Sequence, residues 1–158
     1  MQKPTNKQAA VGGIAAVLAL ATPLVMKWEG KRNDPYDDIV GVRTVCYGET
    51  NVKMRRYTDA ECTSMLRQRL SQDYVKPVLT CAPDLIFYPN AAAASASLAY
   101  NIGSVGFCKS TAARLFNAGD IRGGCNAIAR FNKAGGRVIP GLVNRRRDEV
   151  ALCLKDAK

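Results

Sequence analysis

WEGKRNDPYDDIVGVRTVCYGET, residues 28–50, is the stretch around which the rest of this chain is organised. Glu29 follows directly on an apolar segment, Asp38 stands nine residues later, and Thr44 six residues after that. Trp28 and Gly30, on either side of the first acid, are typical of a helix end with the glycine on the C-cap side. The stretch therefore predicts a carboxylate at the end of a helix, followed at once by a polar region.

The remainder of this stretch predicts a β-hairpin. Asn33, Asp34 and Pro35 are residues typical of a turn. Short strands are expected at residues 36–38 and 42–47, joined by a turn that contains glycine. The sequence thus predicts one small hairpin close to its start.

Glu29, Asp38 and Thr44 are the candidate catalytic residues. Glycoside hydrolysis uses one carboxyl group that stays protonated and gives its proton to the leaving oxygen, and a second that stays ionised and activates water or attacks the sugar. Glu29 adjoins Trp28 and the apolar segment, a setting that favours the protonated form, whereas Asp38 lies in a polar turn. The Thr44 hydroxyl, on the other arm of the turn, can hold a water. Spacing alone also fits ordinary solvated loop acids.

The sequence after the hairpin predicts a helical scaffold. Thr58-Asp59-Ala60-Glu61 has the spacing of a capping box and should open a helix that ends near residue 74, where Lys76-Pro77 breaks it. A helix of small residues at 91–100, capped by Asn90, is apolar on nearly every side and is expected in the core. Further helices are expected at residues 111–117, 121–131 and 140–154, with Ser110, Asp120 and Pro140 at their starts. The predicted fold class is α+β and mostly helical.

The charge of the chain points to a polyanionic partner. Its 158 residues, enough for one compact domain and a short extra segment, carry a net charge of +10. Nucleic acid, an anionic membrane face and the bacterial envelope are the candidates. Nucleic-acid binding is not expected, because the basic residues are scattered and aromatic residues make up 7%. Arg145, Arg146 and Arg147 are expected to be solvated charges or ion pairs, with attraction to the envelope as the functional alternative.

The absence of histidine and the pattern of cysteines exclude several kinds of site. Without histidine there can be no Ser-His-Asp or Cys-His catalysis and no His-ligated metal. The six cysteines include no CxxC pair, so no metal site is expected. An even number after an export-like N-terminus predicts disulfides and an oxidising compartment, and spacing alone does not choose the connectivity. The cysteines are Cys46, Cys62, Cys81, Cys108, Cys125 and Cys153.

Residues 8–26 form an uncharged segment after a short basic start. The length suits a membrane span, which needs about 20 apolar residues, but much of the segment is alanine and glycine, so insertion should be marginal. A cleaved signal peptide, with Ala19-Leu20-Ala21 as its cleavage site, and a buried alanine-rich core helix are alternatives. A weak signal anchor that later leaves the bilayer is favoured, because cleavage after Ala21 would leave a stub before Glu29 too short for a stable helix.

The catalytic stretch resembles that of the tailed-phage lysozymes, glycoside hydrolase family 24. The family pattern is Glu-Gly, Tyr-x-Asp, Gly-x-x-Thr and a Gly-x-Gly-like turn. The chain keeps this order and spacing in Glu29-Gly30, Tyr36-Asp37-Asp38, Gly41-Val42-Arg43-Thr44 and Cys46-Tyr47-Gly48. One departure is Glu49, which stands where the family often has histidine. The resemblance extends over nearly the whole chain after Met26.

The resemblance implies a lysozyme-like fold with a small N-terminal hairpin lobe and a larger helical lobe. It also implies cleavage, with inversion, of the β-1,4 bond between N-acetylmuramic acid and N-acetylglucosamine in peptidoglycan, by a monomer that needs no cofactor. Glu29 is the implied acid, Asp38 the residue that positions or activates water, and Thr44 its helper. The implied substrate-binding residues are Tyr36, Tyr100 and Asn101.

The N-terminal segment resembles the signal-anchor-release branch of these lysozymes. That branch implies an endolysin for host cell lysis, exported to the host periplasm, tethered to the inner membrane through residues 8–26, and then released. Residues 1–27 would form the anchor and residues 28–158 the catalytic domain. While the anchor lies in lipid, the helix turn of Glu29 cannot fold onto the domain, so refolding after release is the predicted activation. No cysteine precedes Cys46, so disulfide exchange from the anchor is not available.

Related phage enzymes imply a disulfide pairing for the six cysteines. They suggest Cys46 with Cys62, which ties the hairpin to the next helix, and Cys125 with Cys153. Cys81 would then pair with Cys108.

Two other functions remain open from the sequence. A lytic transglycosylase would need only Glu29, would tolerate Asp38→Asn, and would release an anhydro product in place of a reducing end. A non-catalytic wall-binding or nucleic-acid-binding basic protein would need neither residue.

Overall fold

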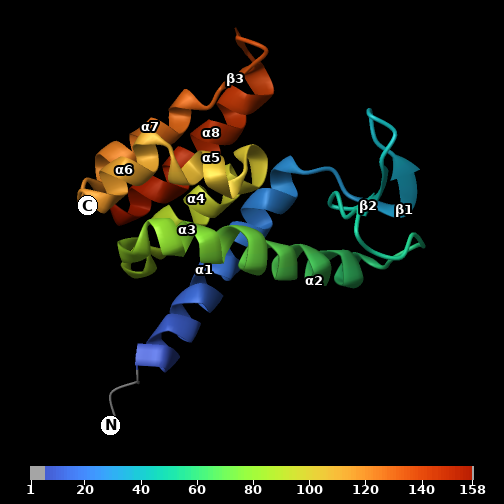
Figure 1. The fold of residues 1–158 in the computed structure, drawn as a ribbon, viewed down its shortest axis with the longest axis horizontal. Coiled ribbons are helices and arrows are strands. Elements are labelled where there is room, and N and C mark those ends of the chain that lie inside the picture. Colours follow the sequence, from blue (N-terminus) through green and yellow to red (C-terminus); the bar gives the residue numbers. More distant parts are fainter. Residues whose placement is uncertain (1–5, 158) are drawn as a thin grey trace.

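The computed structural model describes residues 6–157, with side chains described from residue 13 onward. The chain is mostly helical, with a small antiparallel hairpin near its start, as the sequence predicts. Figure 1 shows the helices gathered on one side and the hairpin of β1 and β2 standing apart on the other. The elements are α1 (Asn6–Trp28), β1 (Arg32–Asp37), β2 (Arg43–Cys46), α2 (Asp59–Arg69), α3 (Lys76–Cys81), α4 (Pro89–Ile102), α5 (Ser104–Cys108), α6 (Thr111–Asn117), α7 (Ile121–Ala127), β3 (Lys133–Ala134), β4 (Arg137–Val138) and α8 (Pro140–Cys153).

Helix α4 is the centre of the larger core. Residues 91–99 are all buried, and α1, α8 and α5 pack around them. Small alanine and serine side chains allow this close approach, so the predicted buried helix is confirmed. The predicted cap is wrong: the N-cap is Tyr88, and Pro89 takes the first helical position, where a missing N–H costs nothing. Asn90 instead donates its side-chain N–H to Asp156 Oδ1 at 2.8 Å.

Helix α1 belongs to two cores at once. Val17 and Ala21 are buried in the larger core, whereas Val25, one turn further on, is buried in a second core beneath the hairpin. Glu29 follows at the end of the helix, where its backbone N–H still donates to Val25 O at 2.9 Å. The docking of α1 therefore fixes where Glu29 lies. No helix among residues 6–157 is both long enough and apolar enough to span a membrane.

The hairpin differs from its prediction in where its strands begin. Asn33, Asp34 and Pro35, expected in a turn, lie within β1, which pairs antiparallel with β2. An irregularity in register between Arg32 and Tyr36 accommodates Pro35, which has no N–H for the ladder. The Asn33 side chain donates to Tyr57 O at 2.8 Å and so ties the strand to the start of α2.

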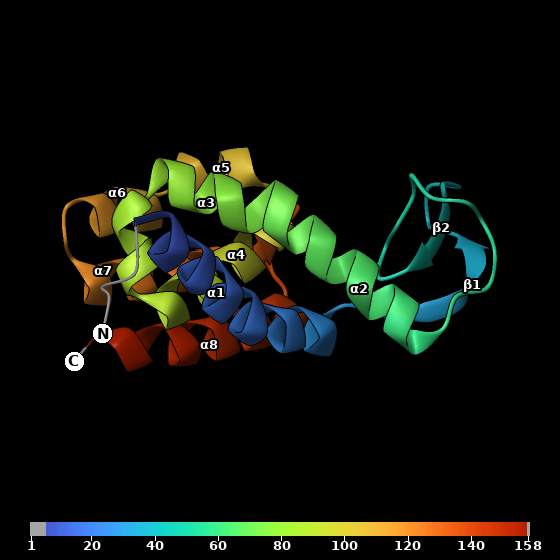
Figure 2. The ribbon, with the colours of Figure 1, turned by 90° about the horizontal axis from the view of Figure 1, so that it is seen from below.

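Helices α2 and α3 form one rod that joins the hairpin to the helical part (Figure 2). The capping box at Thr58 and Glu61 is confirmed. The predicted break at Pro77 is wrong, because a π-helical turn, Leu70–Val75, lies between the two helices. There the Lys76 N–H reaches back five residues to Ser71 O, and this wider spacing admits a proline without ending the rod.

For the C-terminal helices, the predicted first residues agree with the structure better than the predicted last residues do. Ser110, Asp120 and Pro140 begin α6, α7 and α8 as expected. The helix predicted over 121–131 is shorter, since α7 gives way to a 3-10 turn, Ile128–Arg130. Helix α5 was not predicted. The expected glycine loop is the turn between β3 and β4, where Gly135 and Gly136 have φ of 57° and 77°.

Three disulfides join the cysteines in the pairing that the resemblance implied. They are Cys46–Cys62, Cys81–Cys108 and Cys125–Cys153. The first ties β2 to α2, with both cysteines fully buried. Each bridge thus adds a covalent link between two elements.

Replacing Cys46 and Cys62 together by alanine should lower the free energy of unfolding by about 3 kcal/mol, because the bridge closes a loop of 16 residues. Urea unfolding of the oxidised proteins measures the difference. An unchanged midpoint would contradict the prediction, and a peptide map that links Cys46 to Cys81 would reject the pairing itself.

Candidate active site

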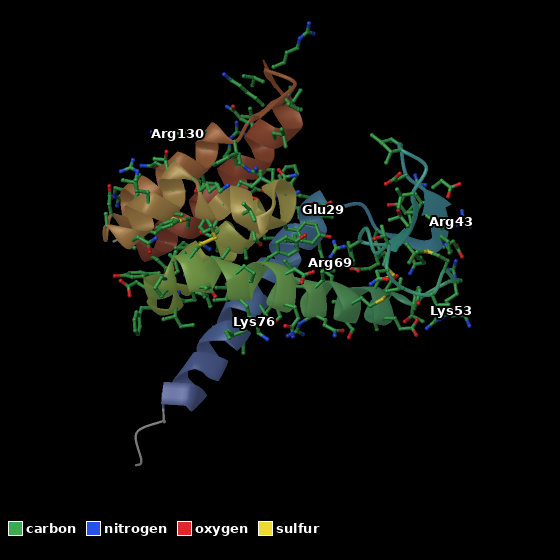
Figure 3. The ribbon with its side chains drawn as sticks, viewed as in Figure 1. Glu29, Arg43, Lys53, Arg69, Lys76 and Arg130 are labelled. Carbon is green, nitrogen blue, oxygen red and sulfur yellow. A yellow bond between two sulfur atoms is a disulfide. The ribbon has the colours of Figure 1, made fainter. Side chains whose placement is uncertain are left out.

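A cleft of about 320 Å³ lies where the end of α1 meets the hairpin, and Glu29 and Tyr36 both line it. Gly30, Lys31 and Arg32 contribute the connection between helix and strand, and Tyr47 and Gly48 contribute the segment after β2. Figure 3 shows Glu29 at the junction between the helical part and the hairpin that carries Arg43. The cleft thus combines an acid from the helical part with an aromatic wall from the hairpin.

Glu29 is held from one side by Arg145 of α8. Arg145 Nη1 donates to Glu29 Oε1 at 2.7 Å, while the Glu29 side chain remains 27% exposed. Among residues 13–157 no hydrogen bond reaches its other oxygen, Oε2. The sequence predicted an apolar setting for this carboxyl group; the structure adds a buried cation. One oxygen is therefore fixed and the other is available to a ligand in the cleft.

Arg145 belongs to a buried network of charges centred on Glu149. The residue exposures are 5% for Arg145, 1% for Arg146 and 0% for Glu149. The Glu149 carboxylate lies 3.3 Å from Arg145 Nε and 2.6 Å from Arg146 Nε, and it accepts a hydrogen bond from Ser97 Oγ at 2.7 Å. Of the two expected states, solvated charge or ion pair, Arg145 and Arg146 have the second. Both form ion pairs with Glu149, and α8 turns them into the interior. Arg147 is exposed, as expected.

Asp38 and Thr44 both lie in the hairpin and do not line the cleft of Glu29. Asp38 Oδ1 accepts the backbone N–H groups of Val40 and Val42 at 3.0 and 2.8 Å, so this oxygen organises the turn. Thr44 is 4% exposed, and its hydroxyl donates to Val42 O at 2.8 Å. Thr44 is the register partner of Tyr36, which places it directly across the sheet from a cleft residue.

Tyr100 and Asn101, at the end of α4, also bond to the protein itself. The Tyr100 hydroxyl donates to Tyr47 O at 2.6 Å and contacts Arg69, and burial raises the pKa of this phenol. Asn101 Oδ1 accepts from Arg146 Nη1 at 3.0 Å, although much of the residue is exposed. Tyr100 therefore links α4 to the hairpin side of the cleft, and Asn101 links it to the charge network.

Glu49, the position at which the chain departs from the family pattern, is buried with 7% exposure. Its carboxylate lies 3.5 Å from Arg69 Nε. Burial raises the pKa of Glu49; Arg69 opposes this and Asp73 adds to it. Arg69 also donates to Gly48 O at 3.0 Å, so the pair holds the segment after β2 against the end of α2.

Replacing Glu49 by glutamine should change how stability depends on pH. The folded pKa lies above the ordinary value of 4.5, so the carboxyl contributes its full stability below pH 4.5 and loses it as pH rises through the folded pKa. The free energy of unfolding of the wild type, relative to Glu49→Gln, should therefore fall as pH rises above 4.5. Urea unfolding across this range measures the difference.

Glu61→Gln is a control of opposite sign. The hydrogen bond from Arg55 lowers the pKa of Glu61. The contribution of Glu61 to the free energy of unfolding is therefore present at pH values above its ordinary pKa of 4.5 and is lost as pH falls through the folded pKa. Parallel pH curves for the wild type and Glu49→Gln would contradict the prediction.

The sequence did not indicate Arg145, Glu149 or Arg69 as parts of the site, and it gave Tyr47 only as part of the turn motif of the catalytic stretch. For Arg145 and Glu149 the available signal was the spacing of Arg145, Arg146 and Glu149 on one helix, which predicts ion pairs but not their burial. Among the described residues no cluster of three or more metal-binding side chains occurs.

Comparison with known sequences finds similarity to phage proteins. A family model described as phage lysozyme matches residues 26–149. The SAR-endolysin of Enterobacteria phage P21 is 37% identical over 159 residues, which cover 92% of each chain. The SAR-endolysin of bacteriophage PS119 is 38% identical over 135 residues, which cover 80% of this chain and 76% of that protein.

Comparison with solved structures gives the same fold. The active form of the endolysin of P1 phage superimposes with a TM-score of 0.69 over 94% of this chain and 95% of that chain, at 24% identity. The helical part with its small hairpin is thus an arrangement already known from a phage endolysin.

Proposed function

The chain belongs to the phage lysozyme family, and on that premise we propose how its residues act. It is an endolysin, a lysozyme-type hydrolase with muramidase function, and peptidoglycan is its substrate. The observation that carries the proposal is the position of Glu29, which projects from the end of α1 into the cleft with one oxygen held by Arg145.

In our proposal Glu29 is the general acid. A muramidase must protonate the glycosidic oxygen as the bond to the sugar breaks. Glu29 Oε1 is fixed at 2.7 Å from Arg145 Nη1, and this contact orients the carboxyl group, so that Oε2 can present the proton to a glycan in the cleft. Tyr36 and Tyr47, which line the same cleft, provide aromatic surface for a sugar ring.

We propose Asp38 and Thr44 for the water side of the reaction. Asp38 uses Oδ1 to organise the turn, which leaves its second oxygen to accept a proton from water. Thr44 lies across the sheet from Tyr36 and so connects this turn to the cleft. Water attack on the face opposite the leaving group inverts the sugar. Tyr100 and Asn101 remain candidates for binding the glycan at the end of α4.

The reaction is tested by incubating the oxidised full-length protein with purified peptidoglycan. New reducing ends on N-acetylmuramic acid would identify hydrolysis at the proposed bond. Anhydro-muramic products would contradict it and identify a lytic transglycosylase.

We also propose that residues 1–27 are a signal-anchor-release segment. The relatives from phages P21 and PS119 are named SAR-endolysins. In the described structure Val17, Ala21 and Val25 of α1 are buried in the two cores. While residues 8–26 lie in the inner membrane, Val17, Ala21 and Val25 cannot pack in the two cores, and Glu29 cannot lie beside Arg145. Release into the periplasm would then complete the fold and the active site together.

Replacing Ala15, Ala16 and Ala19 by leucine should keep the protein in the membrane. All three are exposed on α1, so the substitutions leave its buried face unchanged. Each leucine favours insertion by about 0.3–0.6 kcal/mol. Together they should lower the released fraction by about tenfold.

Fractionation of expressing cells into membrane and periplasm measures this effect. Glutamine at the same three positions is the matched control and should increase release. A leucine variant that is released as fast as the wild type would contradict the anchor proposal.

A further inference from the structure

We propose that Glu149 is a positioning residue that controls the protonation of Glu29 through Arg145, with Arg146 as its opposing charge. The inference rests on the proposed role of Glu29 as general acid. Glu149 does not reach the cleft: its side chain is 0% exposed, and its contacts are with Ser97 of α4 and with two arginines of its own helix.

The guanidinium group of Arg145 contacts two carboxylates, those of Glu29 and Glu149. Arg145 Nη1 lies 2.7 Å from Glu29 Oε1, while Arg145 Nε lies 3.3 Å from Glu149 Oε1. Arg145 Nη2 also donates to Ser97 O at 3.3 Å, a third contact that helps to hold the group between the two acids. Because the surroundings are buried, charges act on one another more strongly than they would in water. Glu149 therefore offsets part of the positive charge that Glu29 would otherwise meet.

Arg146 acts in the opposite sense. Its Nε lies 2.6 Å from Glu149 Oε2, and its Nη1 donates to Asn101 Oδ1 at 3.0 Å and to Phe131 O at 3.3 Å. Burial raises the pKa of Glu149, whereas Arg146, Ser97 and Arg145 act against this and favour its ionised form. With Glu149 ionised and both arginines charged, the group is neutral when Glu29 is ionised and carries one positive charge when Glu29 is protonated. The negative charge of Glu149 favours protonated Glu29, and the positive charge of Arg146 favours the ionised form.

The variants tested below leave the other charged or titratable residues near Glu29 unmutated. Lys27, its neighbour on α1, is paired with Asp148 at 2.6 Å. Other such groups, on the cleft walls and on the adjoining helices, include Lys31, Arg32, Tyr36, Tyr47, Arg69, Tyr74 and Tyr100.

The test is the pH profile of peptidoglycan hydrolysis by the oxidised full-length protein. A general acid loses activity as rising pH removes its proton, which gives the profile an alkaline limb. In Glu149→Gln this limb should move to lower pH by about one unit, because glutamine keeps the shape and removes the charge. In Arg146→Met it should move to higher pH. In the double variant, which restores the charge balance, it should return close to the wild-type position.

Opposite shifts in the two single variants are the signature of the proposed role. A purely structural role would lower activity at every pH and leave the limb in place, and such a result overturns the inference. If Glu149→Gln does not fold, the shift of the alkaline limb in Arg146→Met tests the inference by itself: a shift to higher pH supports it, and an unmoved limb overturns it. The double variant should fold, since a buried ion pair tolerates replacement by uncharged residues of similar volume.

Glu29→Gln, measured alongside, separates the two proposals. An active Glu29→Gln would remove the proposed acid itself. An inactive Glu29→Gln together with unmoved limbs in Glu149→Gln and Arg146→Met would overturn only the role of Glu149.

Discussion

Replacing Glu29 by glutamine is expected to lower the rate of peptidoglycan hydrolysis by about 10²- to 10⁴-fold, the contribution typical of a general acid. Glutamine has nearly the shape of glutamate, and its amide oxygen can still accept the hydrogen bond that Arg145 donates at 2.7 Å. It cannot give a proton to the glycosidic oxygen. The loss should therefore appear in the rate of the chemical step, with binding of the glycan nearly unchanged.

The measurement is the release of reducing ends from purified peptidoglycan, with thermal unfolding of each protein as the test of folding. Asp84→Asn is a matched control, because Asp84 is exposed on a short helical turn away from the cleft and loses the same charge. It should keep wild-type activity. If Glu29→Gln folds and still hydrolyses peptidoglycan at a rate near that of the wild type, Glu29 is not the acid.

Replacing Asp38 by asparagine is expected to lower the rate by about 10²-fold or more, because a positioned base contributes by that order. This substitution separates two roles of one side chain. Asp38 Oδ1 accepts the N–H groups of Val40 and Val42, and the oxygen of asparagine can accept both. The turn should therefore survive, while the capacity to take a proton from water is lost.

Asp37→Asn is the matched control for Asp38→Asn. Asp37 is the preceding residue, its side chain is 63% exposed, and it pairs at 3.4 Å with Arg43 on the surface. Its loss should change activity little, since exposed ion pairs contribute little. Activity near wild type in a folded Asp38→Asn, together with anhydro products, would contradict hydrolysis by two acids and favour a transglycosylase that uses Glu29 alone.

Local sequence determined the elements whose ends depend on neighbouring residues. The capping box at Thr58, the caps at Ser110 and Asp120, and Pro140 at the start of α8 are all where the sequence predicts them. The three caps can be read because each is a bond between residues three apart, and Pro140 because proline is favoured at the first position of a helix. The hairpin and the mostly helical class follow from the same kind of local pattern.

Two errors in the prediction have tertiary causes. Pro77 does not end its helix, because a π-helical turn before it supplies a different hydrogen-bond spacing. Pro35 stands within a strand, because the register of β1 on β2 is irregular there. Neither arrangement follows from the residues beside the proline, since each depends on the partner that packs against it.

For the candidate site, the local sequence predicts Glu29 at a helix end and a hairpin after it that carries Asp38 and Thr44, as the structure has them. The surroundings of the acid depend on tertiary packing. Arg145 comes from α8, more than a hundred residues later in the chain, and it meets Glu29 because α1 and α8 both pack on α4. Glu149, on the same helix, contacts Arg145 and does not reach Glu29. An arginine side chain is ordinarily exposed to solvent. Arg145 is instead buried beside Glu29, and only folding brings this cation of α8 to the acid at the end of α1.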